Sequence, residues 1–257
     1  MRGLLRGLRS AAAFLTRFPL RATATGGSDV ARSVPWFPVV GGLLGVAAAG
    51  AYVVARLILP AFVAATLAVG VMVVLTGAIH EDGLADTADA FGGRTKEEAL
   101  RILKDPAHGT YGVVAVALSL LVRIGALATL DRWSALAVLP AAHALSRAAA
   151  MGLLGTIEPA TDEGLGASYA SIVTGRRVVA AISVGLLIGL ASLGLWVLPA
   201  SFLAALGASF MGYVAVRKFS GITGDVLGAA QQFAEVLVLL LGAAAATKGW
   251  PSLVWWR

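Results

Sequence analysis

Seven long apolar stretches dominate this sequence of 257 residues and limit what it can fold into. They cover residues 39–60, 61–79, 111–130, 133–154, 178–199, 201–216 and 226–247. About 20 apolar residues are needed for a helix to cross a bilayer, and these stretches lack the alternation of barrel strands. The pattern predicts an all-α, polytopic bundle of transmembrane helices in one domain, residues 1–257. We expect six or seven spans, because residues 201–216 are short for a full crossing.

Composition excludes the other broad classes of protein. Hydrophobic residues make up 58% of the chain and charged residues only 13%, whereas a soluble domain averages about a quarter charged. Disordered chains combine low hydrophobicity with high charge, which is the opposite balance. The chain has no cysteine, so disulfides, thiolate metal sites and cysteine nucleophiles are excluded. No basic run interleaves with aromatic residues, so the net charge of +6 does not indicate nucleic-acid binding.

The charged residues predict how the chain sits in the membrane. The first 20 residues carry Arg2, Arg6 and Arg9 on a short apolar segment, which predicts an amphipathic helix at the lipid surface. Placing the N-terminus in the cytoplasm leaves most of the 20 basic residues on the inner side. Most of the 14 acidic residues fall on the same side, in two long inner loops. We therefore expect a multi-pass protein of a bacterial inner membrane, in contact with membrane lipid, whose active site faces the cytoplasm.

A cluster of acids follows the second apolar stretch. If the helix continues through residues 80–89, Asp82, Asp86 and Asp89 share one face at spacings of four and three residues. These carboxylates repel one another and oppose the dipole at a helix C-terminus, so a solvated helix end is the weaker interpretation. Mg²⁺ is held by carboxylates together with substrate phosphates. The cluster predicts a Mg²⁺ site formed by Asp82, Asp86 and Asp89, and Glu81 beside them is either a further ligand or a solvated acid.

Other residues near the cluster are suited to bind a phosphorylated substrate. Gly83 would let a bulky ligand approach the backbone, and His80 is a candidate ligand or base. A capping box at Thr95 and Glu98 begins an amphipathic helix whose basic residues form either a solvated face or phosphate clamps. The candidate substrate-binding residues are Arg94, Arg101, Lys104, Gly109, Thr110, Gly112, Thr223 and Gly224.

The last apolar stretch brings two more acids. Asp225 enters the membrane from the same face as the first cluster. Glu235 lies some three turns deeper and must face the interior of the bundle. Arg123 and Arg147 are plausible buried partners, and the sequence alone does not decide whether their pairing is structural or functional.

These residues resemble the cobalamin synthase family, the adenosylcobinamide-GDP ribazoletransferases. Five motifs occur in the family's order, at residues 13–19, 36–41, 80–89, 104–112 and 221–235. Two positions differ from the family pattern: Glu81 replaces a usually apolar residue, and residues 106–107 replace a usually polar pair. The resemblance implies a Mg²⁺-dependent phosphotransferase that joins adenosylcobinamide-GDP to alpha-ribazole or its 5′-phosphate, giving adenosylcobalamin or its 5′-phosphate and GMP. The catalytic residues it implies are His80, Asp82, Asp86, Asp89, Asp105 and Asp225.

Two other functions were weighed against this one. A CDP-alcohol phosphotransferase-like enzyme of phospholipid synthesis also uses spaced aspartates, but its spacing differs from that of residues 82–89. A cation transporter would need acids near the middle of the bilayer, and only Glu235 lies deep in an apolar stretch. The preference for ribazole or its phosphate, the number of metal ions and the formation of homo-oligomers are left open by the sequence.

Overall fold

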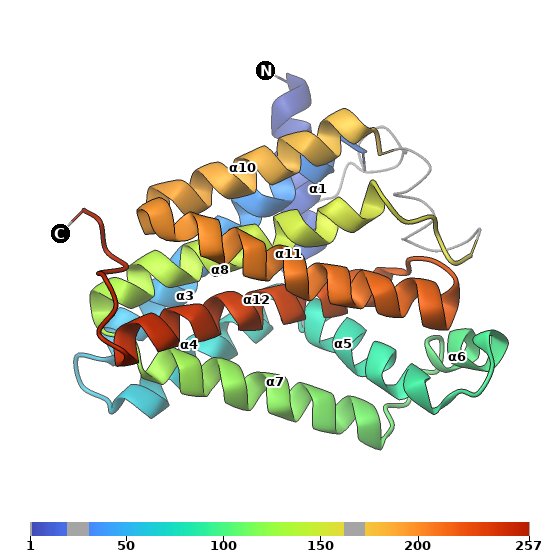
Figure 1. Ribbon diagram of the computed structural model, residues 1–257, viewed down its shortest axis with the longest axis horizontal. Coiled ribbons are helices and arrows are strands. Elements are labelled where there is room, and N and C mark those ends of the chain that lie inside the picture. The colour runs from blue at the N-terminus through green and yellow to red at the C-terminus, as the bar shows by residue number, and fades with distance from the viewer. Residues whose placement is uncertain (1, 20–30, 162–172, 257) are drawn as a thin grey trace.

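The computed structural model describes residues 2–19, 31–161 and 173–256, and these residues form a bundle of helices (Figure 1). The helices are α1 (Arg2–Leu15), η1 (Val34–Trp36), α3 (Phe37–Ala55), α4 (Ala61–Thr76), α5 (Ile79–Asp89), η2 (Ala90–Gly92), α6 (Lys96–Ile102), α7 (Thr110–Ala128), α8 (Arg132–Leu154), α10 (Gly175–Leu193), η3 (Gly194–Trp196), α11 (Val197–Val214), η4 (Ala215–Phe219) and α12 (Gly224–Thr247). Within the described ranges the only β-type pairing is a single bridge between Pro159 and Ile222.

The long helices have the length and hydropathy of membrane spans. Five helical stretches qualify, or six if α4 and α5 form one bent span. The longest of them, Gly175–Phe219, turns at Gly194 (φ +58°) and contains both α10 and α11, which Figure 1 shows as a hairpin, so it supplies two of the expected spans. The all-α, polytopic fold predicted from the apolar stretches is confirmed, and the chain is a membrane protein.

Helix α8 is the centre of the bundle. Its most apolar window is 83% buried, and it packs against α3, α10, α11 and α12. Small residues permit this packing: a Cβ on Gly45 would lie 2.5 Å from the Leu139 carbonyl oxygen of α8. Glycines of this kind let membrane helices approach each other closely. The opposite surfaces of the outer helices carry exposed large apolar side chains, such as Leu118 on α7 and Leu187 on α10, as expected of faces turned to lipid.

The second span ends earlier than its apolar stretch predicts. Helix α4 stops at Thr76, and α5 then leaves at 88° to it, so the helix does not continue into the acidic cluster. Gly77 (φ +63°) and Ala78 (φ +58°) both adopt the left-handed conformation at the break. The backbone N–H of Arg17 donates to the Leu75 carbonyl at 2.8 Å, which ties the segment after α1 to this turn.

The predicted N-terminal helix is present as α1. Figure 1 shows α1 running across the direction of the long helices, and its Ala11 and Leu15 are buried. Phe14 stacks on Phe37 of α3, with ring centroids 5.6 Å apart. Helix formation at the N-terminus is therefore confirmed, while the contact of α1 with the lipid surface stays a prediction.

Candidate active site

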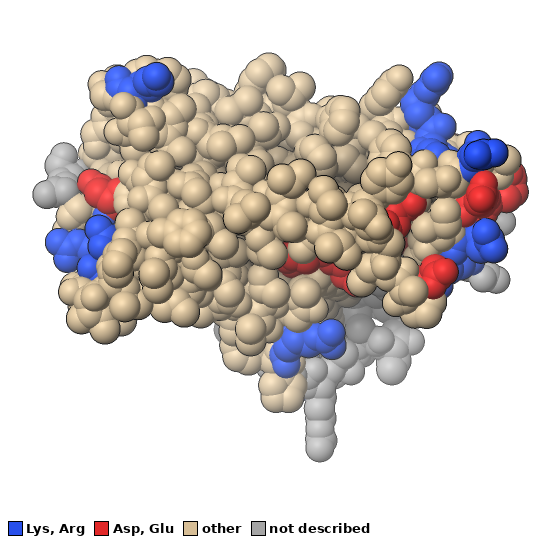
Figure 2. All heavy atoms as spheres, turned by 90° about the horizontal axis from the view of Figure 1, so that it is seen from below, with Lys and Arg blue, Asp and Glu red and all other residues tan. Residues whose placement is uncertain are grey.

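Two of the predicted aspartates meet a histidine at the end of the molecule where α5 and α6 lie. Asp82 and Asp86 are one turn apart on α5. His108, from the loop between α6 and α7, places Nε2 3.6 Å from Asp82 Oδ1 and Nδ1 3.4 Å from Asp86 Oδ1. One ligand atom from each residue lies within 4.8 Å of the other two, as a metal site requires. Figure 2 shows acidic and basic side chains gathered at this end, beside a mostly uncharged middle band.

Asp89 shares the helix with this Asp82–Asp86–His108 group but faces backbone donors. Its Oδ2 accepts a hydrogen bond from the Gly109 N–H at 2.7 Å, and its Oδ1 accepts one from the Gly112 N–H at 2.8 Å. A carboxylate at the start of α7 is also favoured by the helix dipole. Through these two hydrogen bonds Asp89 holds the loop that carries His108 in place. Each oxygen accepts one hydrogen bond and keeps a further lone pair, so coordination of a metal ion by Asp89 stays a prediction.

Glu81 points away from the Asp82–Asp86–His108 group. Its Oε1 lies 2.8 Å from Arg123 Nη2, in the interior of the bundle. Adjacent residues of a helix project about 100° apart, so a ligand set containing both Glu81 and Asp82 is disfavoured by α5 itself. The predicted role of Glu81 as a further metal ligand is therefore corrected: among the described side chains it belongs to a buried ion-pair network.

A contact between α5 and α12 brings Asp225 to the site. A Cβ on Gly83 would lie 2.7 Å from the Asp225 carbonyl oxygen, so Gly83 accommodates a neighbouring helix, not the bulky ligand predicted for it. Asp86 lies on α5, outside the five spanning helices. Partial burial, followed by the charges of Asp82 and Asp225, raises the pKa of Asp86 to about 6. The crowded negative charge makes this a site that a cation would stabilise.

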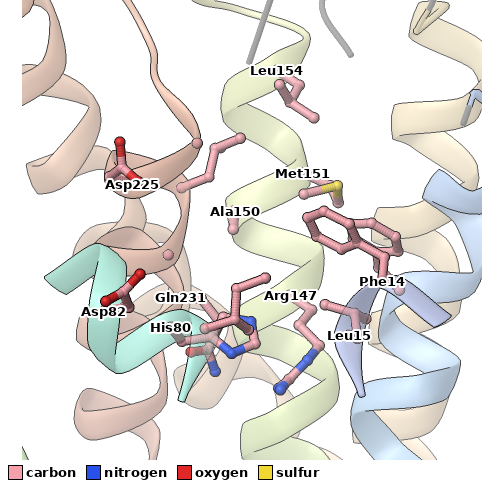
Figure 3. A pocket seen from close by; sticks show the side chains of 15 residues that line it. Phe14, Leu15, His80, Asp82, Arg147, Ala150, Met151, Leu154, Asp225 and Gln231 are labelled. Atoms are coloured by element: carbon pink, nitrogen blue, oxygen red, sulfur yellow. The ribbon is translucent and has the colours of Figure 1, made fainter. Parts of the chain in front are cut away.

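A pocket of about 220 Å³ opens beside these acids (Figure 3). Asp82 of α5 and Asp225 of α12 flank it, while His80, Arg147 and Gln231 gather at its inner end. Its other walls are mainly apolar. The sequence-predicted residues His80, Asp82, Asp225 and Gly224 therefore line one cavity, although they come from segments some 140 residues apart.

The sequence of this chain matches a known protein family. Residues 7–243 match the family described as cobalamin-5-phosphate synthase. The chain belongs to this family.

Relatives in the family carry one name. The chain is 39% identical over 249 residues to the adenosylcobinamide-GDP ribazoletransferase of Bradyrhizobium diazoefficiens, covering 95% of each chain. It is 41% identical to the protein of that name from Rhizobium etli strain CIAT 652, covering 89% of this chain and 93% of the relative. For the Ralstonia nicotianae protein of that name the identity is 40%, with 93% and 95% covered. No solved structure matches the chain. The resemblance drawn from the five motifs is confirmed.

Several residues predicted to belong to the site or to the segments beside it lie at the surface. The threonine half of the capping box predicted at α6 is confirmed: Thr95 Oγ1 accepts from the Glu98 N–H at 3.2 Å, while Glu98 Oε2 accepts from the Arg94 N–H at 2.8 Å. Asp105 Oδ1 accepts from the Ala107 N–H at 3.0 Å within its own turn. Thr223 caps α12, accepting from the Val226 N–H at 3.3 Å. Exposed residues with no ion pair in the described part of the chain are Arg94, Arg101 and Lys104, and Thr110 is exposed at the first turn of α7.

Two residues that shape the site, His108 and Lys218, are not among those predicted from the sequence. His108 lies in the loop before α7, between residues that the sequence predicts for the site, and this position could have identified it. Lys218 Nζ donates to the Gly93 carbonyl oxygen at 2.5 Å and lies 5.8 Å from the centroid of the Phe91 ring, which anchors the segment before α6. These contacts join residues more than 120 positions apart, and no local pattern predicts them.

Proposed function

We propose that this membrane protein joins adenosylcobinamide-GDP to alpha-ribazole, or to alpha-ribazole 5′-phosphate, and releases GMP. The product is adenosylcobalamin or its 5′-phosphate, late in cobalamin biosynthesis. The family and the names of its members support this reaction over phospholipid synthesis or cation transport. The observation that carries the proposal in the structure is the Asp82–Asp86–His108 group beside a pocket. We further propose a bacterial inner-membrane location with this group facing the cytoplasm.

The reaction is a phosphoryl transfer with a simple balance. A ribazole hydroxyl attacks the phosphorus nearest the cobinamide, the bond from that phosphorus to the oxygen bridging to GMP breaks, and GMP leaves. The hydroxyl proton passes to a base. Such transfers need little covalent chemistry from the protein, because alignment and neutralisation of the phosphate oxygens provide most of the acceleration.

The carboxylates fit a Mg²⁺ ion. Asp82 and Asp86 would hold it, since Mg²⁺ takes one or two carboxylates and completes its shell with substrate phosphates and water. Asp86 is partly buried, and the charges of Asp82 and Asp225 lie near it, so the pKa of its carboxyl group is raised. When bound, the ion supplies positive charge for the diphosphate oxygens. Asp225 lines the pocket next to these residues and is positioned to orient the attacking hydroxyl.

We assign proton acceptance to His108 instead of His80. The His108 ring is exposed and contacts both carboxylates, where a substrate hydroxyl would arrive. His80 is only 7% exposed and lies at the inner end of the pocket. A neutral imidazole nitrogen can accept a proton from a hydroxyl group within hydrogen-bond reach, as general-base catalysis requires.

The proposed function is tested with protein purified into lipid nanodiscs. Incubation with adenosylcobinamide-GDP, alpha-ribazole and Mg²⁺ is expected to release GMP and form the joined product in equal amounts. Chelation of divalent cations should stop both. GMP formation without ribazole, or no GMP formation with all components present, would contradict the proposal.

The loop that holds His108 gives a prediction about Gly112. In Gly112→Ala the added methyl group would collide with the Asp89 carboxylate and the Ala85 carbonyl oxygen, displacing the loop. We expect GMP release to fall by more than about tenfold, since small displacements of catalytic groups are costly. Gly125→Ala on the same helix is the control, because a Cβ there meets nothing within 4 Å. Equal activities in the two variants would show that the loop tolerates displacement.

The crowded acids also predict a change in stability. A carboxyl group whose pKa is raised on folding destabilises the folded state as the pH rises above its unfolded-state pKa, and the effect is complete once the pH exceeds the raised value. Asp86→Asn should therefore raise the thermal midpoint of the metal-free protein at pH 7.5, by about 2–4 °C after allowance for solvent screening. Mg²⁺ should raise the midpoint of the wild type and not that of the variant. An Asp86→Asn midpoint below that of the wild type without metal would contradict this account.

A further inference from the structure

The pocket of about 220 Å³ contains features that the metal site does not use. Its volume is below the roughly 300–1,000 Å³ of pockets that hold a whole drug-sized ligand, so it suits part of a substrate. Phe14 and Phe37 both line it, and their rings are stacked on each other with only 8° between the planes, so the pair adds aromatic surface to the pocket. Met151 and Leu154 of α8 add further apolar surface. Walls of this kind favour a flat, uncharged aromatic group.

The inner end of the pocket holds two polar side chains with unused hydrogen-bonding capacity. Arg147 is 3% exposed, and its Nη1 donates to the His143 carbonyl oxygen at 3.0 Å. Arg147 forms no ion pair, and its Nη2 forms no hydrogen bond, with any described residue. The His80 ring, 7% exposed, likewise has no hydrogen-bond partner in the described part of the chain. Figure 3 shows both side chains at the same end of the pocket, beside Gln231.

Buried polar groups of this kind are normally satisfied. The amide of Gln231 is satisfied by the protein: its Nε2 donates to Ser146 Oγ at 3.0 Å and to Glu235 Oε2 at 2.6 Å. Arg147 and His80 are left to receive a ligand. A guanidinium has donors only, so the group that enters must present a hydrogen-bond acceptor at its leading edge.

We propose that this pocket receives the benzimidazole base of the ribazole substrate, with Arg147 donating a hydrogen bond to the ring nitrogen that carries no sugar. This inference rests on the proposed function and names the part of the substrate that the pocket recognises. The flat base packs on Phe14 and Phe37, and the ribose then lies at the outer end, beside Asp82 and Asp225. His80 faces the same edge of the base and acts as a binding residue.

An anionic occupant is disfavoured by the same residues. A phosphate group would have to pass Asp82 and Asp225, whose carboxylates repel it, and would leave water for mainly apolar walls. One free guanidinium nitrogen does not replace that hydration. A neutral base avoids this penalty and still satisfies Arg147.

The experiment compares two probes of nearly identical shape. 1-Methylbenzimidazole carries the acceptor nitrogen, and 1-methylindole has a C–H group in its place. Equilibrium dialysis against protein in nanodiscs, with empty nanodiscs as the blank, needs neither Mg²⁺ nor adenosylcobinamide-GDP. We expect 1-methylindole to bind about tenfold more weakly, because it leaves Arg147 unsatisfied. Equal affinities, or displacement of 1-methylbenzimidazole by millimolar inorganic phosphate, would overturn the proposal.

A variant pair locates the binding. Ala150→Phe fills this pocket and should abolish 1-methylbenzimidazole binding and raise the KM for ribazole more than tenfold. Ala149→Phe makes the same change at the preceding residue. Ala149 lines a different cavity between α8, α10 and α11, so this variant should leave binding unchanged. Unaltered binding in folded Ala150→Phe would overturn the proposal. GMP release without base binding would refute only this inference, whereas base binding without GMP release would refute the proposed function. If Ala150→Phe fails to fold, the comparison of the two probes on the wild-type protein still tests the proposal.

Discussion

Asp82→Asn is expected to reduce GMP release by about a hundredfold to a thousandfold, the loss typical of removing one electrostatic contact to a transition state. Asparagine keeps the shape of the side chain but removes the charge that would hold Mg²⁺. The carboxylate of Asp82 is 61% exposed, so the fold does not depend on it. The variant should therefore insert into membranes and unfold at or slightly above the temperature of the wild type, because it also removes one of the charges crowded at Asp86. Initial rates and thermal unfolding, measured on the same preparation, check both statements.

Glu97→Gln is the matched control for this variant. Glu97 is also exposed and lies on α6, at the same end of the molecule, but it is not part of the Asp82–Asp86–His108 group. Raising the Mg²⁺ concentration should recover part of the activity of Asp82→Asn, because Asp86 remains, and should leave Glu97→Gln unaffected. Near-normal turnover by Asp82→Asn at low Mg²⁺ would remove the metal site from the mechanism.

The fold was predictable where the lipid environment dictates the sequence. Spanning segments must be apolar and helical, so the stretches at 111–130, 133–154 and 226–247 coincide closely with α7, α8 and α12. The break after Thr76 was not predicted. Ala78 has no preference for positive φ, and the turn is held by Arg17, which is distant in the sequence. Tertiary contacts of this kind leave no local pattern.

The site was predictable to the extent that it is local. A spacing of four residues puts Asp82 and Asp86 on one face of any helix, whatever its direction, so the 88° bend did not separate them. The partners of Asp89 and Glu81 come from segments 20 to 151 residues away, which helical spacing does not reveal. Gly83 illustrates a different difficulty. The sequence predicts that a group lies close to the backbone at Gly83, but only the structure shows that this group belongs to helix α12.

Glu235→Gln is expected to destabilise the protein by about 3 kcal/mol, the lower end of the cost of breaking a buried ion pair. Glu235 is 3% exposed, with Oε1 3.3 Å from Arg123 Nη1 and Oε2 2.9 Å from His143 Nδ1. The amide leaves the positive charge near it in excess in the interior of the bundle. In a chain of this length such a loss lowers the thermal midpoint by about 6–12 °C, measurable by unfolding in detergent.

Arg147→Met should reverse part of this loss when it is combined with Glu235→Gln. The buried network of Glu81, Glu235, Arg123 and Arg147 carries two negative and two positive charges. Removing Glu235 and Arg147 together restores that balance, and the Glu81–Arg123 pair at 2.8 Å stays intact. Each single variant leaves one buried charge uncompensated. The double variant should therefore lose less stability than the sum of the two single losses, by about 1 kcal/mol or more.

This cycle measures the coupling between Glu235 and Arg147. The two residues form no ion pair with each other in the described structure, but both contact His143 Nδ1, at 2.9 Å and 3.3 Å, so they share a neighbour as well as a buried charge balance. In the poorly screened interior of a membrane bundle, charges interact beyond contact distance, and the losses should not add. Additive losses would mean that water or lipid head groups screen the network. Arg147 would then be held by its contacts with the ring and the carbonyl oxygen of His143.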